Sequence, residues 1–161
     1  MERRSSENNS HGLRSENIQS ISYSAKAIYE WGRGLKSDKS VIRPFIEKLI
    51  YMIELGYFLG LVAVLAMVNK MLNDNWLTAN DINNLIENLP ELFEKADYMN
   101  YEEENEDVIV LSNIRAECVK LARDILKQRN EPIPALQNIL DKAKNDALPE
   151  VRFAEQDEYC K

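Results

Sequence analysis

The amino-acid sequence predicts an all-α protein, and three observations lead to this prediction. Apolar residues recur at the three- and four-residue spacing of helices along most of the chain, and no segment alternates cleanly with a period of two. Only 5 glycines and 5 prolines interrupt the 161 residues, too few for a many-turned β fold. Hydrophobic residues make up 45% of the chain, which is enough for a core and excludes wholesale disorder. The expected architecture is a stack of antiparallel helical hairpins or an irregular helical bundle.

The sequence predicts one tail and one domain. Residues 1–16 consist largely of Ser, Asn, Arg and Glu with almost nothing to bury, so we expect a disordered tail there. Residues 17–161 are expected to form a single all-helical domain. Its first helix is predicted to end at Trp31, because Gly32 and Gly34 follow and favour a loop.

Two helices are predicted in the next stretch. Ser40 is a fair N-cap for a helix that runs to Ile53, and Pro44 falls in its first turn, where a missing N–H costs little. The apolar run over residues 55–72 is long enough to favour a helix over a strand. A stack of hairpins needs a turn between these two helices, and Gly56 is placed to make it.

The most clearly marked helix start in the sequence is at Thr78. Its side chain is predicted to cap the helix, with Asp81 as the acidic partner of a capping box. Leu77 and Ile82 are placed as a hydrophobic staple on either side of the cap. Pro90 then predicts the start of a further helix.

The C-terminal part is expected to contain an acidic loop and three helices. The loop spans residues 97–107, and its carboxylates should favour the positive N-terminal end of the following helix, about twenty residues long. Pro132 and Pro134 together predict the start of the next helix, and Pro149 predicts the start of a last short one.

Three of the prolines are regularly spaced. Pro44, Pro90 and Pro134 lie 46 and 44 residues apart, and each opens a segment of similar pattern. In each segment the second and sixth residues after the proline are apolar and share one helix face. This period falls within the ~40–47 residues of helical-hairpin repeats.

On these residues the chain resembles the HEAT- and armadillo-type helical repeat proteins. The resemblance is firmest over residues 133–154, where a proline-started helix and a turn with Asp146 precede a second helix opened by Pro149, Val151 and Arg152. In that family the Asp and the Arg brace neighbouring repeats, so the resemblance implies a structural role for Asp146 and Arg152. It also implies a right-handed stack of helical hairpins.

The apolar segment over residues 49–68 allows two interpretations. Nineteen of its twenty residues are apolar, and Gly56 and Gly60 form a GxxxG pattern, so the segment could cross a bilayer once. Glu54 opposes a membrane span, because a carboxylate there costs roughly 2–3 kcal/mol on insertion. We therefore predict a buried core helix, in which Glu54 has a structural role as a paired carboxylate. A single membrane span is the alternative.

The composition argues against several classes of function. The formal net charge of -7 has the wrong sign for a generic nucleic-acid binder. The single histidine, His11, lies in the expected tail, where a general base would have no support. Cys118 falls on an apolar helix stripe and is expected to be a buried hydrophobe rather than a nucleophile. No enzymatic activity, no metal and no cofactor are therefore predicted.

The sequence instead favours a protein that binds other proteins. A tyrosine-containing segment beside an acidic run, and a basic segment further upstream, are the two expected contact regions. Their residues are Tyr98, Met99, Tyr101, Glu102, Glu103 and Glu104 in the first region and Arg33, Lys36, Lys39 and Arg43 in the second. The expected function is that of an adaptor or assembly subunit in the cytoplasm that binds another protein or itself. The alternative is a small protein anchored in a membrane through residues 49–68.

Overall fold

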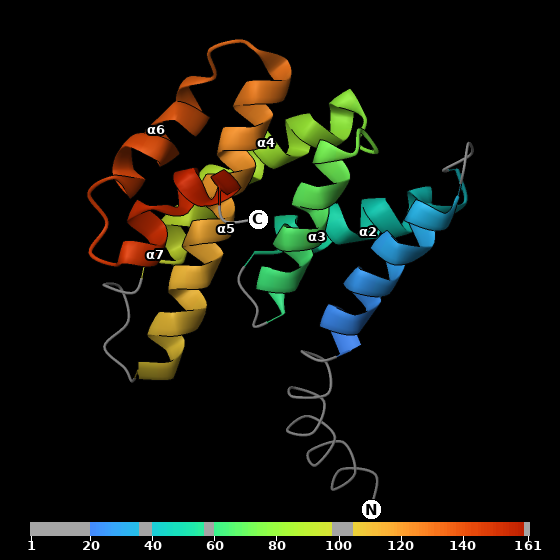
Figure 1. Ribbon diagram of the computed structural model, residues 1–161, viewed down its shortest axis with the longest axis horizontal. Coiled ribbons are helices and arrows are strands. Elements are labelled where there is room, and N and C mark those ends of the chain that lie inside the picture. Colours follow the sequence, from blue (N-terminus) through green and yellow to red (C-terminus); the bar gives the residue numbers. More distant parts are fainter. Residues whose placement is uncertain (1–19, 36–39, 57–59, 98–104, 160–161) are drawn as a thin grey trace, which may run out of the picture.

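The computed structural model describes residues 20–35, 40–56, 60–97 and 105–159 (Figure 1). Within these ranges all regular secondary structure is helical and no residue lies in a strand, which confirms the predicted all-α fold. The first helix covers residues 20–34. It is followed in order by η1 (Ser40–Ile42), α2 (Arg43–Glu54), α3 (Leu61–Asn73), α4 (Ala79–Lys95), α5 (Asn105–Arg129), α6 (Pro134–Ala143), α7 (Pro149–Arg152) and η3 (Ala154–Tyr159).

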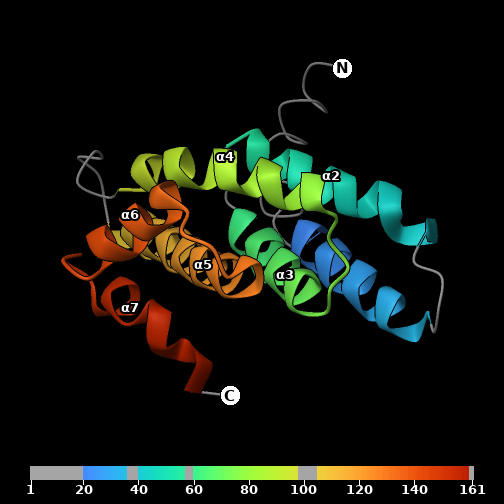
Figure 2. The same ribbon diagram turned by 90° about the horizontal axis from the view of Figure 1, so that it is seen from above.

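Successive helices alternate between two rows that pack against each other. One row contains α2, α4 and α6, and the other contains the helix at residues 20–34, α3, α5 and α7 (Figure 2). α5 is the longest of the described helices and lies next to α3, α4, α6 and α7. Because each helix buries one side against the other row, the core forms between the rows.

The core is centred on α3 and the helices around it. Leu65 and Met71 of α3, Leu85 of α4 and Ile114 of α5 are completely shielded from solvent. The buried apolar side chains of the described residues join in one continuous cluster that extends from the first helix to η3. All of the described helices therefore contribute to one core.

The apolar segment over residues 49–68 is divided between two helices. α2 ends at Glu54, and Gly56 has a φ of 93°, a left-handed conformation that glycine adopts without steric cost. α3 then begins at Leu61. In the parts of the chain that the structure describes, no helix has both the length and the apolar character needed to cross a bilayer.

The expected burial of Glu54 is wrong, because its side chain is exposed at the end of α2. Ile46, Ile50 and Ile53 form the stripe of α2 that faces the core. Residue 54 follows Ile53 by about 100° around the helix axis, which turns its side chain away from that stripe. Glu54 lines a shallow groove beside α4 instead, together with Arg43.

The start of α4 confirms the predicted capping box. The Asp81 N–H donates a hydrogen bond to the Thr78 hydroxyl at 3.1 Å, and the Thr78 N–H donates to the Asp81 carboxylate at 2.9 Å. Leu77 and Ile82 are both buried, as the staple requires. Two of the free N–H groups at the start of this helix are therefore satisfied within the chain.

The predicted helix start at Pro90 is wrong, because α4 continues through this residue. A proline in a helix interior removes one backbone hydrogen bond and normally weakens the helix. The helix persists because its buried stripe continues across the proline, from Leu89 to Leu92. Pro44 and Pro134 do lie in the first turns of α2 and α6, so the three prolines do not occupy equivalent positions.

The start of α2 also differs from the prediction. Ser40 opens the short turn η1, and Ile42 is the N-cap of α2 without a side-chain hydrogen bond. Pro44 therefore provides the local signal for this helix, since its fixed φ suits the first turn.

The first helix does not end at Trp31 but continues through Gly32 to Gly34. Gly32 is required by close packing rather than by a turn. A Cβ atom at this position would lie 2.6 Å from the Trp76 ring and 2.7 Å from the Ile42 side chain. The glycine therefore allows the first helix to approach the turn after α3 and the start of α2.

Replacing Gly32 with alanine is expected to destabilise the protein by about 1–3 kcal/mol, because the methyl group overpacks the contact with Trp76. Gly34 is the matched control, since a Cβ there meets no described atom within 4 Å. Gly34→Ala should be neutral or stabilising by up to about 1 kcal/mol, because alanine favours the helix. Urea unfolding of both variants measures the difference, and equal effects would refute the packing explanation.

α5 begins earlier than the sequence predicts. Its first residue is Asn105, so residues 105–107 of the predicted acidic loop belong to the helix. Pro134 and Pro149 start α6 and α7, as predicted. The remaining residues of the predicted loop after Asp97 lie outside the described residues.

Candidate functional site

Large apolar side chains are exposed mainly on the first two helices and the turn between them. Eight such side chains occur among the described residues, and six of them belong to this region. The six are Tyr23, Trp31, Val41, Phe45, Tyr51 and Leu55, whereas Ile109 and Phe153 lie on α5 and after α7. A concentration of exposed apolar surface on one part of a molecule is typical of an interaction site.

α2 and its flanking residues carry a second apolar stripe in addition to the one that faces the core. This stripe has the 4-3-4-3 spacing that places side chains on one face of a helix. Its residues are Val41, Phe45, Lys48, Met52 and Leu55. Val41, Phe45 and Leu55 have 53%, 43% and 67% of their surface exposed, so the stripe faces solvent.

The first helix presents a matching stripe of mostly small residues. Ser20, Ser24, Ala27 and Trp31 follow one another with a 4-3-4 spacing, and all four are exposed. The ring of Trp31 meets the ring of Phe45 edge-on, with the centroids 5.7 Å apart. We call the two stripes together the apolar seam.

A groove of about 450 Å³ runs along the apolar seam. It exists because Ser20, Ser24 and Ala27 are too small to fill the space opposite Phe45 and Met52. Its floor is formed by partly buried side chains of both helices that pack on the core. The groove is thus a preformed, largely apolar recess between two helices, with two serines on one wall and a lysine on the other.

Lys48 is the charged residue among the side chains that line this groove. It occupies the middle position of the stripe on α2, with two apolar positions on either side. Within the described parts of the chain, Lys48 has no ion-pair partner. Its ammonium group therefore places a positive charge at the centre of an apolar surface.

The structure describes two of the predicted basic contact residues and places both outside the apolar seam. Arg43 donates to the two carboxylate oxygens of Asp81 at 2.7 and 2.9 Å, so its guanidinium is held within the chain. Arg33 pairs with Glu30 on the same helix at 3.4 Å. Arg33 is exposed, and its ion pair is of the weak surface kind.

The other predicted contact residues lie outside the described part of the chain. They are Lys36, Lys39, Tyr98, Met99, Tyr101, Glu102, Glu103 and Glu104. α4 ends at Lys95 and α5 begins at Asn105 on either side of the second group. Their role in binding stays a prediction.

Asp81 combines the capping box with the ion pair to Arg43. Burial acts to raise the pKa of Asp81, but the hydrogen bonds from Arg43 and from the Thr78 N–H outweigh it and lower the pKa below its ordinary value. A carboxylate whose pKa is lowered by folding stabilises the folded state above its unfolded pKa of about 3.9. That stabilisation is lost as the pH falls through the lower pKa of the folded state.

Asp81→Asn is expected to reduce the free energy of unfolding at pH 7 by about 1–3 kcal/mol, because a charged hydrogen-bonded group is lost. The variant should also lose part of the stability change seen as the pH falls below about 4. Chemical unfolding of both proteins at several pH values between 2 and 7 measures both effects. If the free energies of unfolding of the two proteins change in parallel over this pH range, Asp81 does not stabilise the folded state through its carboxylate.

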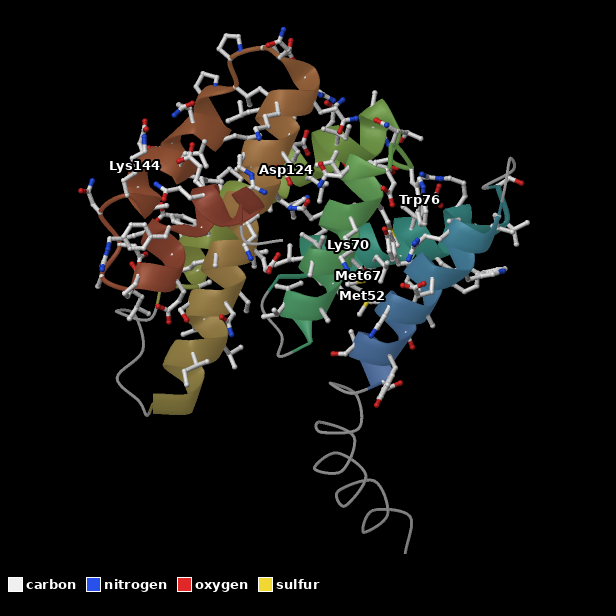
Figure 3. All side chains as sticks on the ribbon, viewed as in Figure 1. Met52, Met67, Lys70, Trp76, Asp124 and Lys144 are labelled. Atoms are coloured by element: carbon white, nitrogen blue, oxygen red, sulfur yellow. The ribbon has the colours of Figure 1, made fainter. Side chains whose placement is uncertain are left out.

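A separate polar groove of about 640 Å³ lies between the first helix, α3 and α5. Figure 3 shows Lys70 and Asp124 on the neighbouring helices α3 and α5. The Tyr29 hydroxyl donates to Asp74 at 2.7 Å, and its ring stacks on Trp76 with the centroids 5.2 Å apart. The Lys70 ammonium lies 5.5 Å from the centre of the Tyr29 ring.

The deepest charge in the polar groove is neutralised within the chain. Asp124 accepts hydrogen bonds from Asn73 at 3.1 Å and from Arg123 at 2.8 Å. Burial acts to raise the pKa of Asp124, but these hydrogen bonds outweigh it and the pKa lies below its ordinary value. Arg123 also donates to the Glu155 carbonyl at 2.9 Å, which links α5 to η3. We interpret this groove as a structural network.

Cys118 is buried, as the sequence predicts. Burial raises the pKa of its thiol far above the ordinary value, so the thiol stays protonated. Among the described residues, no group of three or more His, Cys, Asp or Glu side chains is arranged to hold a metal ion.

Asp146 and Arg152 both stabilise the turn between α6 and α7. The Asp146 carboxylate accepts hydrogen bonds from Arg115 Nε at 2.9 Å and from the Leu148 N–H at 3.1 Å. Arg152 donates to the carbonyls of Asp146 and Ala147, each at 2.7 Å. Asp146 thus connects the turn to α5, whereas Arg152 acts within the turn.

Comparison of the chain with protein-family models, with curated proteins and with solved structures found no match. Sequence reasoning singled out none of Ser20, Ser24, Ala27 and Lys48, and it did not separate a solvent-facing stripe with Val41 and Phe45 from the stripe of α2 that faces the core. The 4-3-4-3 spacing next to the buried stripe of α2 was the signal that could have separated them.

Proposed function

We propose that this chain is a non-enzymatic helical adaptor or assembly subunit that binds another protein through the apolar seam. The observation that carries the proposal is the groove between the first helix and α2, whose largely apolar lining faces solvent. Burial of such a surface stabilises a complex by roughly 25 cal/mol per Å² of apolar area. The exposed aromatic pair Trp31 and Phe45 is of the kind that dominates binding energy at interfaces. A cytoplasmic location stays a prediction from the sequence.

We also infer a relationship to the HEAT- and armadillo-type repeat proteins. The alternation of helices between two rows and the proline-started α6, followed by the turn with Asp146 and Arg152, support it. The position of Pro90 inside α4 departs from that pattern. Repeat proteins of this kind bind partners through extended helical surfaces, in agreement with an adaptor function.

The binding proposal is tested by comparing two exposed phenylalanines. Phe45→Glu places a charge in the apolar seam, whereas Phe153→Glu makes the same change at a similarly exposed site after α7. Affinity capture from the native cells should recover a partner protein with the wild type and with Phe153→Glu. The amount of partner recovered with Phe45→Glu should be lower by at least about ten-fold. Equal recovery with all three proteins would contradict the proposal.

A further inference from the structure

The geometry points to an amphipathic helix of another protein as the occupant of the groove, with its apolar side in the groove and a carboxylate opposite Lys48. This inference rests on the proposed function and specifies the partner.

The spacing of the walls fits a helix. Both stripes of the apolar seam repeat at alternating intervals of four and three residues, which is the spacing at which one helix packs along another. The small side chains of Ser20, Ser24 and Ala27 allow a third helix to approach closely, while Phe45 and Met52 supply large side chains on the other wall. The stripe from Val41 to Leu55 measures about 21 Å along the axis, so a partner helix of about four turns would cover it.

Lys48 determines the charge expected on the partner. An apolar helix in the groove would remove water from the ammonium group, and an unpaired charge at an apolar interface is costly. A carboxylate on the partner helix at this level would compensate for the lost hydration. Such a charge pair discriminates between partners, because a like charge in the same place is repelled.

The same residue argues against a second copy of this chain as the occupant. A two-fold symmetric dimer whose axis passes through the middle of the stripe on α2 would bring the central residue of the stripe next to its own copy. Lys48 would then face Lys48 of the second copy across an apolar interface. The central position of Lys48 therefore favours a different protein with an acidic residue over self-association.

The test uses the full-length chain and three labelled synthetic peptides, and binding is measured by fluorescence anisotropy. The peptides are identical amphipathic helices of about four turns that differ only at the central position of the apolar face, which is Glu, Gln or Lys. We expect the Glu peptide to bind about ten-fold more tightly than the Lys peptide. Lys48→Glu should reverse this order, because the charge that selects the peptide is inverted.

Lys144→Glu is the matched control for the charge change. Lys144 is exposed at the end of α6, and Figure 3 shows it at the left edge of the molecule, well separated from Met52 and Trp76. This variant should keep the order of the wild type. Phe45→Glu should abolish binding of all three peptides.

Three other outcomes would each overturn the inference. In the first, the three peptides bind equally well and Phe45→Glu still abolishes their binding. This outcome would agree with the proposed function but contradict an acidic residue on the partner. Absence of peptide binding together with a dimer that Phe45→Glu dissociates, measured by light scattering, would make a second copy the occupant. Absence of peptide binding by a monomer in which acrylamide cannot quench Trp31 would indicate that the chain itself covers the groove.

Discussion

Replacing Asp146 with alanine is expected to lower the free energy of unfolding by about 3–5 kcal/mol, because the buried guanidinium of Arg115 loses its counter-charge. Both side chains are almost fully buried, and the Arg115 Nη2 lies 2.8 Å from the carboxylate. The guanidinium also donates to the Phe93 carbonyl and lies 3.8 Å from the centre of the Phe93 ring. The variant therefore weakens the junction of α4, α5 and the turn after α6.

Asp141→Ala is the matched control for this prediction. Asp141 lies on α6 only five positions earlier, but its ion pair with Lys144 is exposed and 3.8 Å long. Its loss should cost less than about 1 kcal/mol. Urea unfolding of both variants gives the comparison. Equal losses of stability would show that Asp146 is not the buried partner of Arg115.

Replacing Leu65 with alanine is expected to destabilise the protein by about 2–5 kcal/mol, because it leaves a cavity in the core around α3. Leu65 is completely shielded from solvent. Leu55 belongs to the same apolar run of the sequence but is exposed at the end of α2. Leu55→Ala should therefore change the free energy of unfolding by less than about 0.5 kcal/mol.

This pair of variants tests how the apolar segment is divided between α2 and α3. The two leucines belong to one apolar run of the sequence, and the turn at Gly56 separates their environments. Urea unfolding of both variants in the absence of detergent measures the difference. A neutral Leu65→Ala variant, or a Leu55→Ala variant that costs as much, would contradict the observed path of the chain.

Much of the fold could be predicted from local patterns. The apolar stripes of α5 and α6, the capping box at Thr78 and the turn at Gly56 are local signals, and the structure contains each of them. The continuation of the helices through Gly32 and Pro90 could not be predicted, because it depends on how each helix packs in the folded protein. Gly32 is required by Trp76, and Pro90 is tolerated because the buried stripe of α4 continues past it.

The candidate site could be predicted only in part, for a physical reason. α2 is apolar on two adjacent faces, and the sequence does not show which face the rest of the chain covers. Glu54 and Arg43 illustrate the same limit. The exposure of Glu54 depends on which face of α2 the rest of the chain covers, and the pairing of Arg43 depends on Asp81, 38 residues away.

The central claim is that the apolar seam is a protein-binding surface, and site-specific crosslinking in the native cells tests it most directly. A photoreactive benzoylphenylalanine is placed at residue 45 in one protein and at residue 153 in another, both exposed positions occupied by phenylalanine. We predict that illumination yields a covalent adduct with a different protein from residue 45 and none from residue 153. The absence of an adduct at residue 45, or the same adduct from both positions, would contradict the claim.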